Sequence, residues 1–519
     1  MEKMSTRKLF ACVSLLLACG GVMAQNPIVR HCYTADPAPM TVTVNDSLYV
    51  YCDEDMNVPG VNDFYYMDRW RVYSTIDMVN WTDHGVAMPR TAFSWASEGT
   101  CWASQCVERN GSYYWYICTT KQGDWRHYLG VGKSNKPSGP FKDARRQTII
   151  DTGEDAIDPT VFIDDDGQAY LYWGNNKLWY GKLKSNMILF DTSIGKNGAV
   201  EVPLTKEAFG GVKVKDDNNK DVIDGVDCYE EGPWLDKRGD NYYLMYAAGG
   251  VPEHISYSMS KSPTGPWEYK GQVMTQQNTG SFTNHSGMVH YEGKDYFFYH
   301  TGWAPGGGGF NRSMAVEEMH FNEDGTIKPV TATHEGVKAL RTMNPYEKQQ
   351  AETLNAAYGI SVVGNETTGV YVTDIHKGDS MRVANVDFGS DGAKSITLRI
   401  AAEKSAGILM IRQNNANGKV LARIKIETTG GTDMWEERTF DLSNTPTGVH
   451  DVHFSFVGTS ETTLFNWDWW RFNDWSTSVD AIDEEQKGSD NAFYTLQGIR
   501  VEHPTQGIYL KKGKKVMLR

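Results

Sequence analysis

The sequence predicts an all-β protein, with a five-bladed β-propeller followed by a β-sandwich (jelly roll) and a short C-terminal β tail. Five aromatic segments ending in tyrosine recur along the first two thirds of the chain, at intervals of about 50 to 75 residues, and a turn stretch precedes each. Helical periodicity is scarce in this region. Short similar strands repeated at such a period are typical of propeller blades. A large β-sandwich with accidental similarity is the alternative.

Each tyrosine-ended segment has a candidate functional residue 14 or 15 positions upstream of its closing tyrosine. The closing tyrosines are Tyr51, Tyr116, Tyr172, Tyr246 and Tyr299. The upstream positions hold Asp36, Trp102 (or Cys101), Asp158, Glu231 and His285. In a ring of equivalent blades these side chains would converge on one axis, so the shared offset predicts a single central site.

The N-terminus has the features of a secretory signal peptide, assigned to residues 1–24. Lys3, Arg7 and Lys8 precede an apolar run, and small residues before Gln25 suit cleavage. The apolar run is too short to span a bilayer. Lipoprotein cleavage with lipidation of Cys19 is the alternative. We therefore expect a secreted, periplasmic or cell-surface protein with no membrane-spanning segment.

The net charge limits the classes of binding partner that we expect, and the cysteine pattern limits the expected zinc sites and disulfides. The formal net charge is −14, which disfavours nucleic acid and anionic lipid but not a neutral glycan. Six of the eight cysteines follow the signal segment, and no CxxC or Cys/His zinc spacing occurs. Export permits disulfides, but these cysteines can also be small buried hydrophobes. We expect a monomer.

The pattern along the chain changes near residue 345. The predicted propeller covers residues 26–345 and the predicted sandwich residues 347–475, where short strands alternate with Gly/Thr/Asp turns. Residues 476–519 comprise a polar linker and a last short β module that ends in a basic cluster.

The three acids on the predicted axis have the residue types that glycosidic bond cleavage needs. One carboxyl group must protonate the leaving oxygen while another activates water or attacks the anomeric carbon. A third acid nearby raises the pKa of the first by like-charge repulsion. Proline follows Asp36, Asp158 and Glu231 within two residues and restricts the local backbone. Taken singly, these acids would be turn or surface residues, and His285 and Trp102 would be core residues.

Residues 26–345 resemble glycoside hydrolase family 43, whose members are inverting five-bladed propellers. The matching stretches include Tyr33-Thr34-Ala35-Asp36-Pro37, Asp158-Pro159-Thr160-Val161-Phe162, Glu230-Glu231-Gly232-Pro233-Trp234 and Phe282-Thr283-Asn284-His285. The resemblance implies that Asp36 is the general base, Glu231 the general acid and Asp158 the pKa modulator. Glu230 competes with Glu231 for the acid role, but the offset and the Glu-Gly-Pro pattern favour Glu231.

The resemblance also implies binding residues. His285 matches a residue used near a central ion, often calcium, and Arg312 matches an arginine that approaches the substrate. Trp95 and Trp102 fall where the family lines its pocket. The stretches Tyr66–Trp70 and Asn80–Gly85 resemble arabinoxylan arabinofuranohydrolases, which remove α-L-arabinofuranosyl branches from xylan. β-Xylosidases and arabinan hydrolases share the same acids, so the plant cell-wall substrate rests on the resemblance.

Residues 347–475 resemble carbohydrate-binding module family 6. By this resemblance Tyr371 and Trp435 would sandwich a sugar ring, Asn466 would hydrogen-bond it, and Glu352 and Asp468 would hold a structural calcium. Ser380 stands where an aromatic residue is frequent, and a purely structural sandwich is the alternative. The final segment resembles export or surface-attachment tails of secreted glycan-degrading proteins. A non-catalytic glycan-binding protein is the rival to the enzyme.

Overall fold

The computed structural model describes residues 26–42, 45–61, 64–153, 155–365, 367–405, 407–458, 462–474, 493–495, 500–501, 504–511 and 514–518. The expected signal peptide, Cys19 and the linker over residues 476–492 lie outside the described residues. No helix in the described part of the chain is long and apolar enough to cross a membrane.

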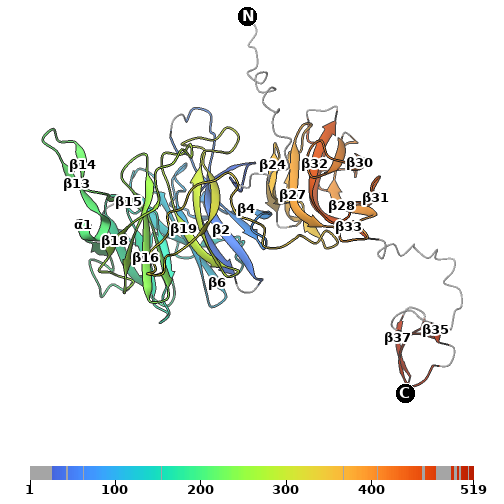
Figure 1. Ribbon diagram of the computed structural model, residues 1–519, viewed down its shortest axis with the longest axis horizontal. Helices are drawn as coiled ribbons and strands as arrows, with labels where there is room; N and C mark the ends of the chain where they lie inside the picture. The colour runs from blue at the N-terminus through green and yellow to red at the C-terminus, as the bar shows by residue number, and fades with distance from the viewer. Residues whose placement is uncertain are drawn as a thin grey trace, which may run out of the picture. The chain divides into compact units, whose positions relative to one another are not determined.

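Five antiparallel sheets form the predicted propeller, which confirms the fold class (Figure 1). Blade 1 contains β1 (Tyr33–Val42), β2 (Ser47–Asp55), β3 (Arg69–Thr75) and β4 (Trp81–Pro89), and blade 2 contains β5 (Ser104–Arg109), β6 (Ser112–Thr120), β7 (His127–Ser134) and β8 (Lys142–Asp143). Blade 3 contains β9 (Thr160–Ile163), β10 (Ala169–Trp173), β11 (Leu178–Leu183) and β12 (Val200–Val202). Blade 4 contains β15 (Tyr229–Arg238), β16 (Asn241–Ala248), β17 (His254–Ser260) and β18 (Glu268–Met274), and blade 5 contains β19 (Gly287–Tyr291), β20 (Lys294–Thr301) and β21 (Ser313–Met319).

The five closing tyrosines lie in the second strand of each blade and are fully buried. Their hydroxyl groups find partners, as buried phenols usually do. Tyr51 donates to the Pro137 carbonyl at 2.8 Å, and Tyr172 donates to the Pro263 carbonyl at 2.6 Å. Both acceptors lie in near-identical Gly-Pro loops of the following blade. The repeated tyrosine therefore ties neighbouring blades together.

The N-terminal segment completes the last blade. The Ile28 N–H donates to the Met314 carbonyl at 2.9 Å, and the Asn26 side chain donates to the Val316 carbonyl at 3.1 Å while accepting from its N–H at 3.0 Å. These bonds join the beginning of the described chain to β21 and close the ring.

Two small elements interrupt the blade pattern. A 3₁₀ turn spans Arg90–Ala92, and the four-residue helix α1 (Lys206–Phe209) precedes the hairpin of β13 (Gly211–Lys215) and β14 (Asp221–Gly225). The hairpin lies between blades 3 and 4 in the sequence and projects from the neighbouring strands (Figure 1).

The sandwich consists of two antiparallel sheets around one apolar core, as predicted. One sheet has the order β25 (Ser361–Asn365), β26 (Gly369–Thr373), β33 (Asn466–Asn473), β28 (Ser395–Ala401) and β31 (Glu436–Asp441), with β22 (Gln349–Gln350) also paired to β33. The other has the order β24 (Ala356–Tyr358), β27 (Ser380–Asp387), β32 (Val449–Gly458), β29 (Gly407–Gln413) and β30 (Val420–Ile426). Trp467 and Trp470 are fully buried between the sheets.

The chain that enters the sandwich first adds an edge strand to the propeller. The short strand β23 (Thr353–Leu354) pairs with β4 of blade 1. The Asn80 amide also donates to the Ala384 carbonyl at 2.9 Å and accepts from the Ala384 N–H at 2.8 Å. Backbone and side-chain hydrogen bonds therefore connect blade 1 to the sandwich.

The C-terminal tail is a small antiparallel sheet of its own. Its strands are β34 (Phe493–Tyr494), β35 (Arg500–Val501), β36 (Gly507–Lys511) and β37 (Lys514–Leu518), in the order β35-β34-β36-β37.

Candidate active site

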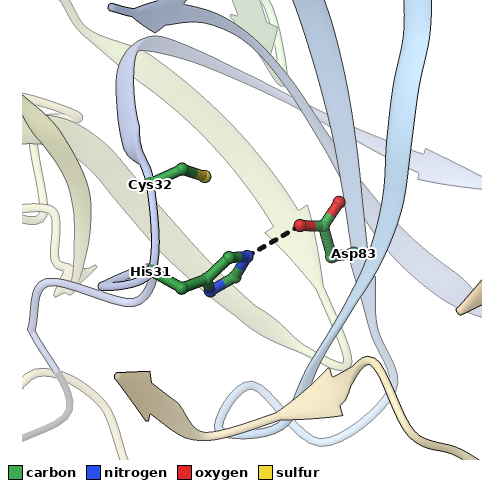
Figure 2. Close-up of side chains that lie close together, drawn as sticks. All are labelled: His31, Cys32 and Asp83. Atoms are coloured by element: carbon green, nitrogen blue, oxygen red, sulfur yellow. Dashed lines mark hydrogen bonds and ion pairs between the residues drawn. The ribbon is translucent and has the colours of Figure 1, made fainter. Parts of the chain in front are cut away.

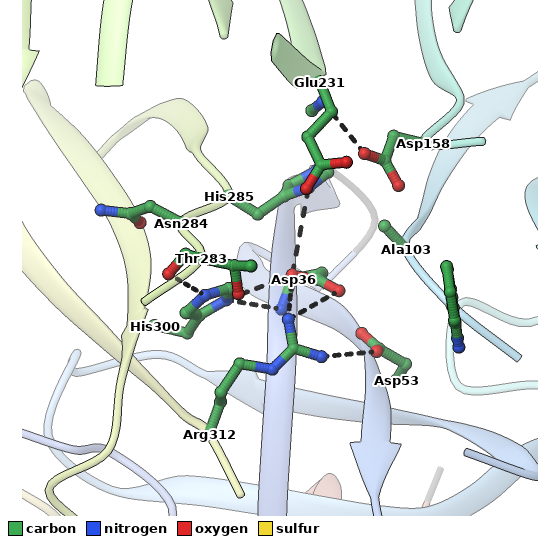
Figure 3. Close-up of polar contacts among 12 residues, drawn as sticks. Asp36, Asp53, Ala103, Asp158, Glu231, Thr283, Asn284, His285, His300 and Arg312 are labelled. Carbon is green, nitrogen blue, oxygen red and sulfur yellow. Dashed lines mark hydrogen bonds and ion pairs between the residues drawn. The ribbon is translucent and has the colours of Figure 1, made fainter. Parts of the chain in front are cut away.

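The structure brings together the three predicted acids, each from the first strand of a blade or the residues just before it (Figure 3). Asp36 lies at an irregularity of β1, and Glu231 lies between two irregularities of β15. Asp158 precedes β9 by two residues. Asp36 and Asp158 have φ angles of 49° and 57°, which are sparsely populated for non-glycine residues. Irregular pairing and this backbone conformation re-aim the side chains toward one site.

Asp36 is held as an anion. Its side chain is 8% exposed, and its Oδ1 lies 3.2 Å from Nη1 of Arg312 and 3.1 Å from Nδ1 of His300. Burial alone would raise the pKa of this carboxyl group. The charge of Arg312 and the contact with His300 outweigh burial and hold the pKa of Asp36 well below its usual range.

The Arg312 side chain is held in place by hydrogen bonds to Asp55. Its backbone N–H and its Nε donate to Oδ2 of Asp55 at 2.7 and 2.9 Å, and Nη2 donates to Oδ1 at 2.9 Å. A guanidinium group that donates hydrogen bonds to both oxygens of one carboxylate has little rotational freedom. Arg312 therefore presents a fixed positive charge to Asp36.

The pKa of Asp158 is shifted in the opposite direction from that of Asp36. It is 5% exposed, and Oδ2 accepts the Gly232 N–H at 3.0 Å. Burial and the nearby charges of Glu231 and Asp36 raise its pKa well above the usual value. Glycine suits position 232 because the φ of 59° is a conformation that side chains rarely adopt, and an added Cβ would make a tight contact of 3.1 Å with Nδ1 of His285.

Glu231 also favours its protonated form. Burial raises its pKa, with further contributions from the charges of Asp36 and Glu230, although the hydrogen bond from the Asn175 amide opposes the shift. The competing Glu230 forms an ion pair with Lys213. The structure therefore places Glu231 rather than Glu230 beside the other two acids (Figure 3).

Two histidines face Asp36. Nδ1 of His285 lies 4.0 Å from Oδ1 of Asp36, and burial lowers the pKa of His285 to about 4. His300, which was not predicted, lies at 0% side-chain exposure and contacts the Thr283 carbonyl through Nε2 at 2.9 Å. Because that contact needs a proton on Nε2, the ring orientation is fixed by the segment before His285.

The two predicted pocket tryptophans have different environments. Trp102 is half-buried and stacks on His127, with ring centroids 4.2 Å apart, and its ring lies 6.1 Å from that of Tyr65. Trp95 packs edge-on against Phe93 and closely approaches Gly130. Both tryptophans pack against the core, and Trp102 also contacts Tyr65, the aromatic side chain beside Arg312.

An unpredicted aromatic wall stands beside Arg312. Its guanidinium lies 4.5 Å from the ring centroid of Tyr65, and Tyr65 contacts Trp102 and three phenylalanines. The phenylalanines are Phe64, Phe282 and Phe310, of which Phe64 is 59% exposed. Aromatic faces of this kind can stack on sugar rings.

The predicted sugar-binding residues of the sandwich contact one another. The rings of Tyr371 and Trp435 are 5.2 Å apart at an interplanar angle of 71°, so they do not form parallel faces around a gap. The Asn466 amide accepts from Thr373 at 2.7 Å and donates to the Thr432 carbonyl at 2.8 Å. A binding role for these three residues stays a prediction that requires rearrangement.

Glu352 is better placed than Asp468 to coordinate a cation. Glu352 is 3% exposed, its Oε2 meets no donor from the described residues, and burial raises its pKa well above the usual value. The Asp468 carboxylate already contacts Arg399. Carboxylate oxygens are the ligands that Ca²⁺ prefers. The surroundings of His285 suit a cation poorly, because Arg312 already supplies positive charge to Asp36.

Within the described residues, one group of three potential metal ligands comes together, and it lies away from the three acids: His31, Cys32 and Asp83 (Figure 2). Arg71 donates to both Asp83 oxygens, at 3.0 and 2.8 Å, and His31 lies 2.8 Å from Oδ2. The carboxylate charge is thus already balanced, and this group is a buried ion-pair network rather than a metal site. The six cysteines in the described part of the chain form no disulfide, and five of them are buried.

Sequence reasoning missed several polar residues of the site: Asp53, Asp55, Asn175, Glu253 and His300. Asp53 and His300 follow a closing tyrosine by two residues and one residue, so extending the offset beyond the tyrosine would have found them. Glu253 and Asn175 lie in loops between the second and third strands of their blades. Loops of unequal length carry no shared offset, so no periodic signal marks them.

The arrangement defines a class of enzyme: an all-β hydrolase in which one carboxyl group has a lowered pKa and two neighbouring carboxyl groups have raised pKa values, the chemistry of a glycosidase. The family model of glycosyl hydrolases family 43 matches residues 24–327, and that of carbohydrate binding module (family 6) matches residues 350–474. The chain therefore belongs to glycoside hydrolase family 43 and carries a family 6 module.

Individual relatives agree with this assignment. The chain is 30% identical to the arabinoxylan arabinofuranohydrolase of Bacillus subtilis (strain 168), over 86% of this chain and 92% of that protein. It is 30% identical to a xylosidase/arabinosidase of Bacteroides ovatus, over 57% of this chain and 94% of that protein. A crystal structure of a family 43 arabinoxylan arabinofuranohydrolase from Bacillus subtilis superimposes with a TM-score of 0.71 at 27% identity, covering 87% of this chain and 98% of that one.

Proposed function

We propose that this glycosidase is an exported, inverting α-L-arabinofuranosidase that removes arabinofuranosyl side chains from arabinoxylan. The proposed acid–base mechanism rests on one observation: two carboxyl groups in one site have pKa values shifted in opposite directions. Arg312 and His300 keep Asp36 ionised, whereas burial and neighbouring acids favour a proton on Glu231.

These states suit a single-displacement hydrolysis. Asp36 takes a proton from the water whose oxygen bonds to the anomeric carbon. Glu231 gives its proton to the leaving oxygen as the glycosidic C–O bond breaks. The nearby charge of Glu231 helps to raise the pKa of Asp158, and this interaction between the two groups supports the role of Asp158 as pKa modulator.

The substrate part rests on the relatives. Similarity to the Bacillus subtilis arabinoxylan arabinofuranohydrolase covers both the propeller and the sandwich. The aromatic wall beside Arg312 offers a surface for a sugar ring, and the negative net charge does not oppose a neutral polysaccharide. The sandwich would keep the enzyme near its polymer and raise the local substrate concentration.

The test uses purified protein on arabinoxylan and on nitrophenyl α-L-arabinofuranoside and β-D-xyloside. We expect release of arabinose, first seen by NMR as the inverted anomer. Asp36→Asn and Glu231→Gln should each lower turnover by roughly 10²–10⁴-fold, while a cooperative unfolding transition shows that each variant is folded. Glu230→Gln, the matched control, should lower it far less. Full activity in either of the first two variants would refute the assignment.

A β-xylosidase is the second candidate, favoured by the similarity to the Bacteroides ovatus xylosidase/arabinosidase. Release of xylose rather than arabinose would select it. Binding to arabinoxylan without any released sugar would instead support a non-catalytic glycan-binding protein.

We also propose that the sandwich holds a structural calcium ion through Glu352 and Asp468. The unpartnered, buried Oε2 of Glu352 supports this site. Asp468 would exchange Arg399 for the ion. The ion would supply fixed positive charge between two carboxylates that otherwise repel each other, and it takes no part in hydrolysis.

A further inference from the structure

A chain of hydrogen bonds leads from the β13–β14 hairpin to the proposed general acid. Nζ of Lys213, in β13, donates to Oδ1 of Asn176 at 2.5 Å. Nδ2 of Asn176 donates to Oδ1 of Asn175 at 2.5 Å. Nδ2 of Asn175 donates to Oε2 of Glu231, also at 2.5 Å. The hairpin, which belongs to no blade, is thereby connected to the carboxyl group of Glu231.

The direction of this chain is fixed at its outer end. A lysine ammonium group has three N–H donors and no acceptor, so Lys213 can face only the amide oxygen of Asn176. The NH₂ group of Asn176 must then face Asn175, and the NH₂ group of Asn175 must face Glu231. An amide that was free to turn over would offer Glu231 an oxygen as readily as an N–H. Lys213 also forms an ion pair with Glu230, which holds the ammonium group beside Asn176.

Backbone contacts hold the loop and the hairpin in this arrangement. The Asn176 N–H donates to the Glu230 carbonyl at 2.7 Å, and Asn176 has a φ of 53°, a conformation that asparagine adopts more readily than most residues. The hairpin begins at Gly211, where an added Cβ would lie 2.1 Å from the Asp227 carbonyl. This close approach fixes the start of β13 against the segment that leads into β15.

We propose that Lys213 is a positioning residue for Glu231. Acting through the two asparagines, it makes Oε2 of Glu231 accept a hydrogen bond, so the proton that the acid transfers is placed on Oε1. If an amide oxygen faced Glu231 instead, the acid would direct its O–H to that oxygen and would have to rotate before it could protonate a leaving group. The proposal rests on the proposed acid role of Glu231.

Asn176→Asp reverses the chain without changing the size of the side chain. Aspartate can only accept, so it would accept from both Lys213 and the NH₂ group of Asn175, which turns the Asn175 oxygen toward Glu231. Asn176 is exposed, and aspartate tolerates its backbone conformation, so the fold should be kept. We expect turnover on arabinoxylan to fall by roughly 10- to 100-fold, part of what a general acid contributes. Turnover on nitrophenyl α-L-arabinofuranoside should fall less, because nitrophenolate needs little help from an acid.

Asn219→Asp is the matched control. Asn219 lies in the turn of the same hairpin, is exposed and has a φ of 61°, so this substitution adds the same charge in a similar backbone conformation. It should keep wild-type turnover on both substrates. The proposal is overturned if Asn176→Asp matches Asn219→Asp, or if it loses the same factor on both substrates.

Two substitutions of Lys213 separate the hydrogen-bond donor from the side-chain length. Methionine has a similar length but no N–H, whereas arginine, like lysine, has donors and no acceptor. Lys213→Met should show the same greater loss on arabinoxylan, and Lys213→Arg should recover most of it. Because Lys213→Met leaves Glu230 without its cation, its stability should fall, so the ratio of turnover on the two substrates is the deciding quantity. An unchanged ratio in Lys213→Met would contradict the proposal.

Infrared spectroscopy of the protonated Glu231 carboxyl group tests the chain of hydrogen bonds without any substrate. Spectra are taken at about pH 5.5, where an exposed aspartate is ionised and a buried acid with a raised pKa keeps its proton. Subtraction of the Glu231→Gln spectrum assigns the C=O band, whose frequency depends on whether Oε2 accepts a hydrogen bond. Asn176→Asp should shift this band, and Asn219→Asp should not. If the band shifts but wild type hydrolyses no tested glycoside, the proposed function alone fails, whereas a band identical in wild type and Asn176→Asp overturns the positioning role.

Discussion

The pKa values of two aspartates in this site, Asp36 and Asp158, are shifted in opposite directions by their neighbours. Asp36 touches a guanidinium and a histidine, whereas Asp158 meets one backbone N–H and two acids. Both have positive φ angles, so the backbone conformation does not explain the difference. The protonation state is therefore set by contacts that come from other blades.

Asp158→Asn should separate stability from activity. Folding raises the pKa of Asp158, so the folded protein holds a proton that the unfolded chain releases above about pH 4. The wild-type residue thus lowers stability as pH rises from that value. Asparagine removes this loss while still accepting the Gly232 N–H. Urea unfolding at pH 7 should show equal or higher stability, with the difference vanishing below pH 4, while turnover falls by roughly 10²-fold. A variant less stable than wild type at pH 7 would contradict this.

Sequence alone could predict Asp36, Asp158, Glu231 and His285 because each occupies an equivalent position in a repeated unit. It could not predict the directions of the pKa shifts, because Arg312 and His300 contact Asp36 from 276 and 264 residues away in the chain.

At the scale of elements, strand pairing within the blades is regular in the packed core and irregular beside the candidate active site. The second strands, which hold the closing tyrosines, pair with the third strands without irregularity. Asp36 and Glu231 lie at register shifts between the first and second strands, and Asp158 lies just before β9. The repeated sequence pattern reflects the regularly paired strands, so the strands and the number of blades could be predicted from it. The pairing of β23 with β4 could not, because an edge strand accepts any extended partner that covers its open groups.

The sandwich sheet that contains β33 should depend on calcium. Glu352 and Asp468 repel each other in the absence of a cation, and binding of an ion only to the folded state stabilises it by about 2.7 kcal/mol at one hundred times its dissociation constant. We expect a chelator to lower the melting temperature and added calcium to restore it. Glu352→Gln should abolish this response, whereas Glu427→Gln, at an exposed position of the same sandwich, should retain it. A wild-type melting temperature that ignores both chelator and calcium would exclude the site.

At the scale of the whole molecule, blade 1 joins a buried ion-pair network of the propeller to the sandwich. The Asp83 N–H donates to the Glu352 carbonyl at 3.1 Å, and the Asp83 side chain binds His31 and Arg71. Asn80, three residues earlier, pairs with Ala384 through both sides of its amide. One strand therefore carries both the buried ion pairs of the propeller and the bonds that hold the sandwich.

His31→Gln should weaken this junction in a pH-dependent way. Burial opposes a charge on His31, but Cys32 and Asp83 overcome it and raise the pKa of His31 to about 10. A histidine whose pKa rises on folding stabilises the protein fully below its unfolded pKa, near 6.5, and loses that contribution as pH rises toward 10. Denaturant unfolding should therefore show a large deficit for His31→Gln at pH 6 that shrinks steadily toward pH 10. His320→Gln removes an exposed histidine and should match wild type throughout. A deficit of the same size at every pH would mean that the His31–Asp83 contact is not an ion pair.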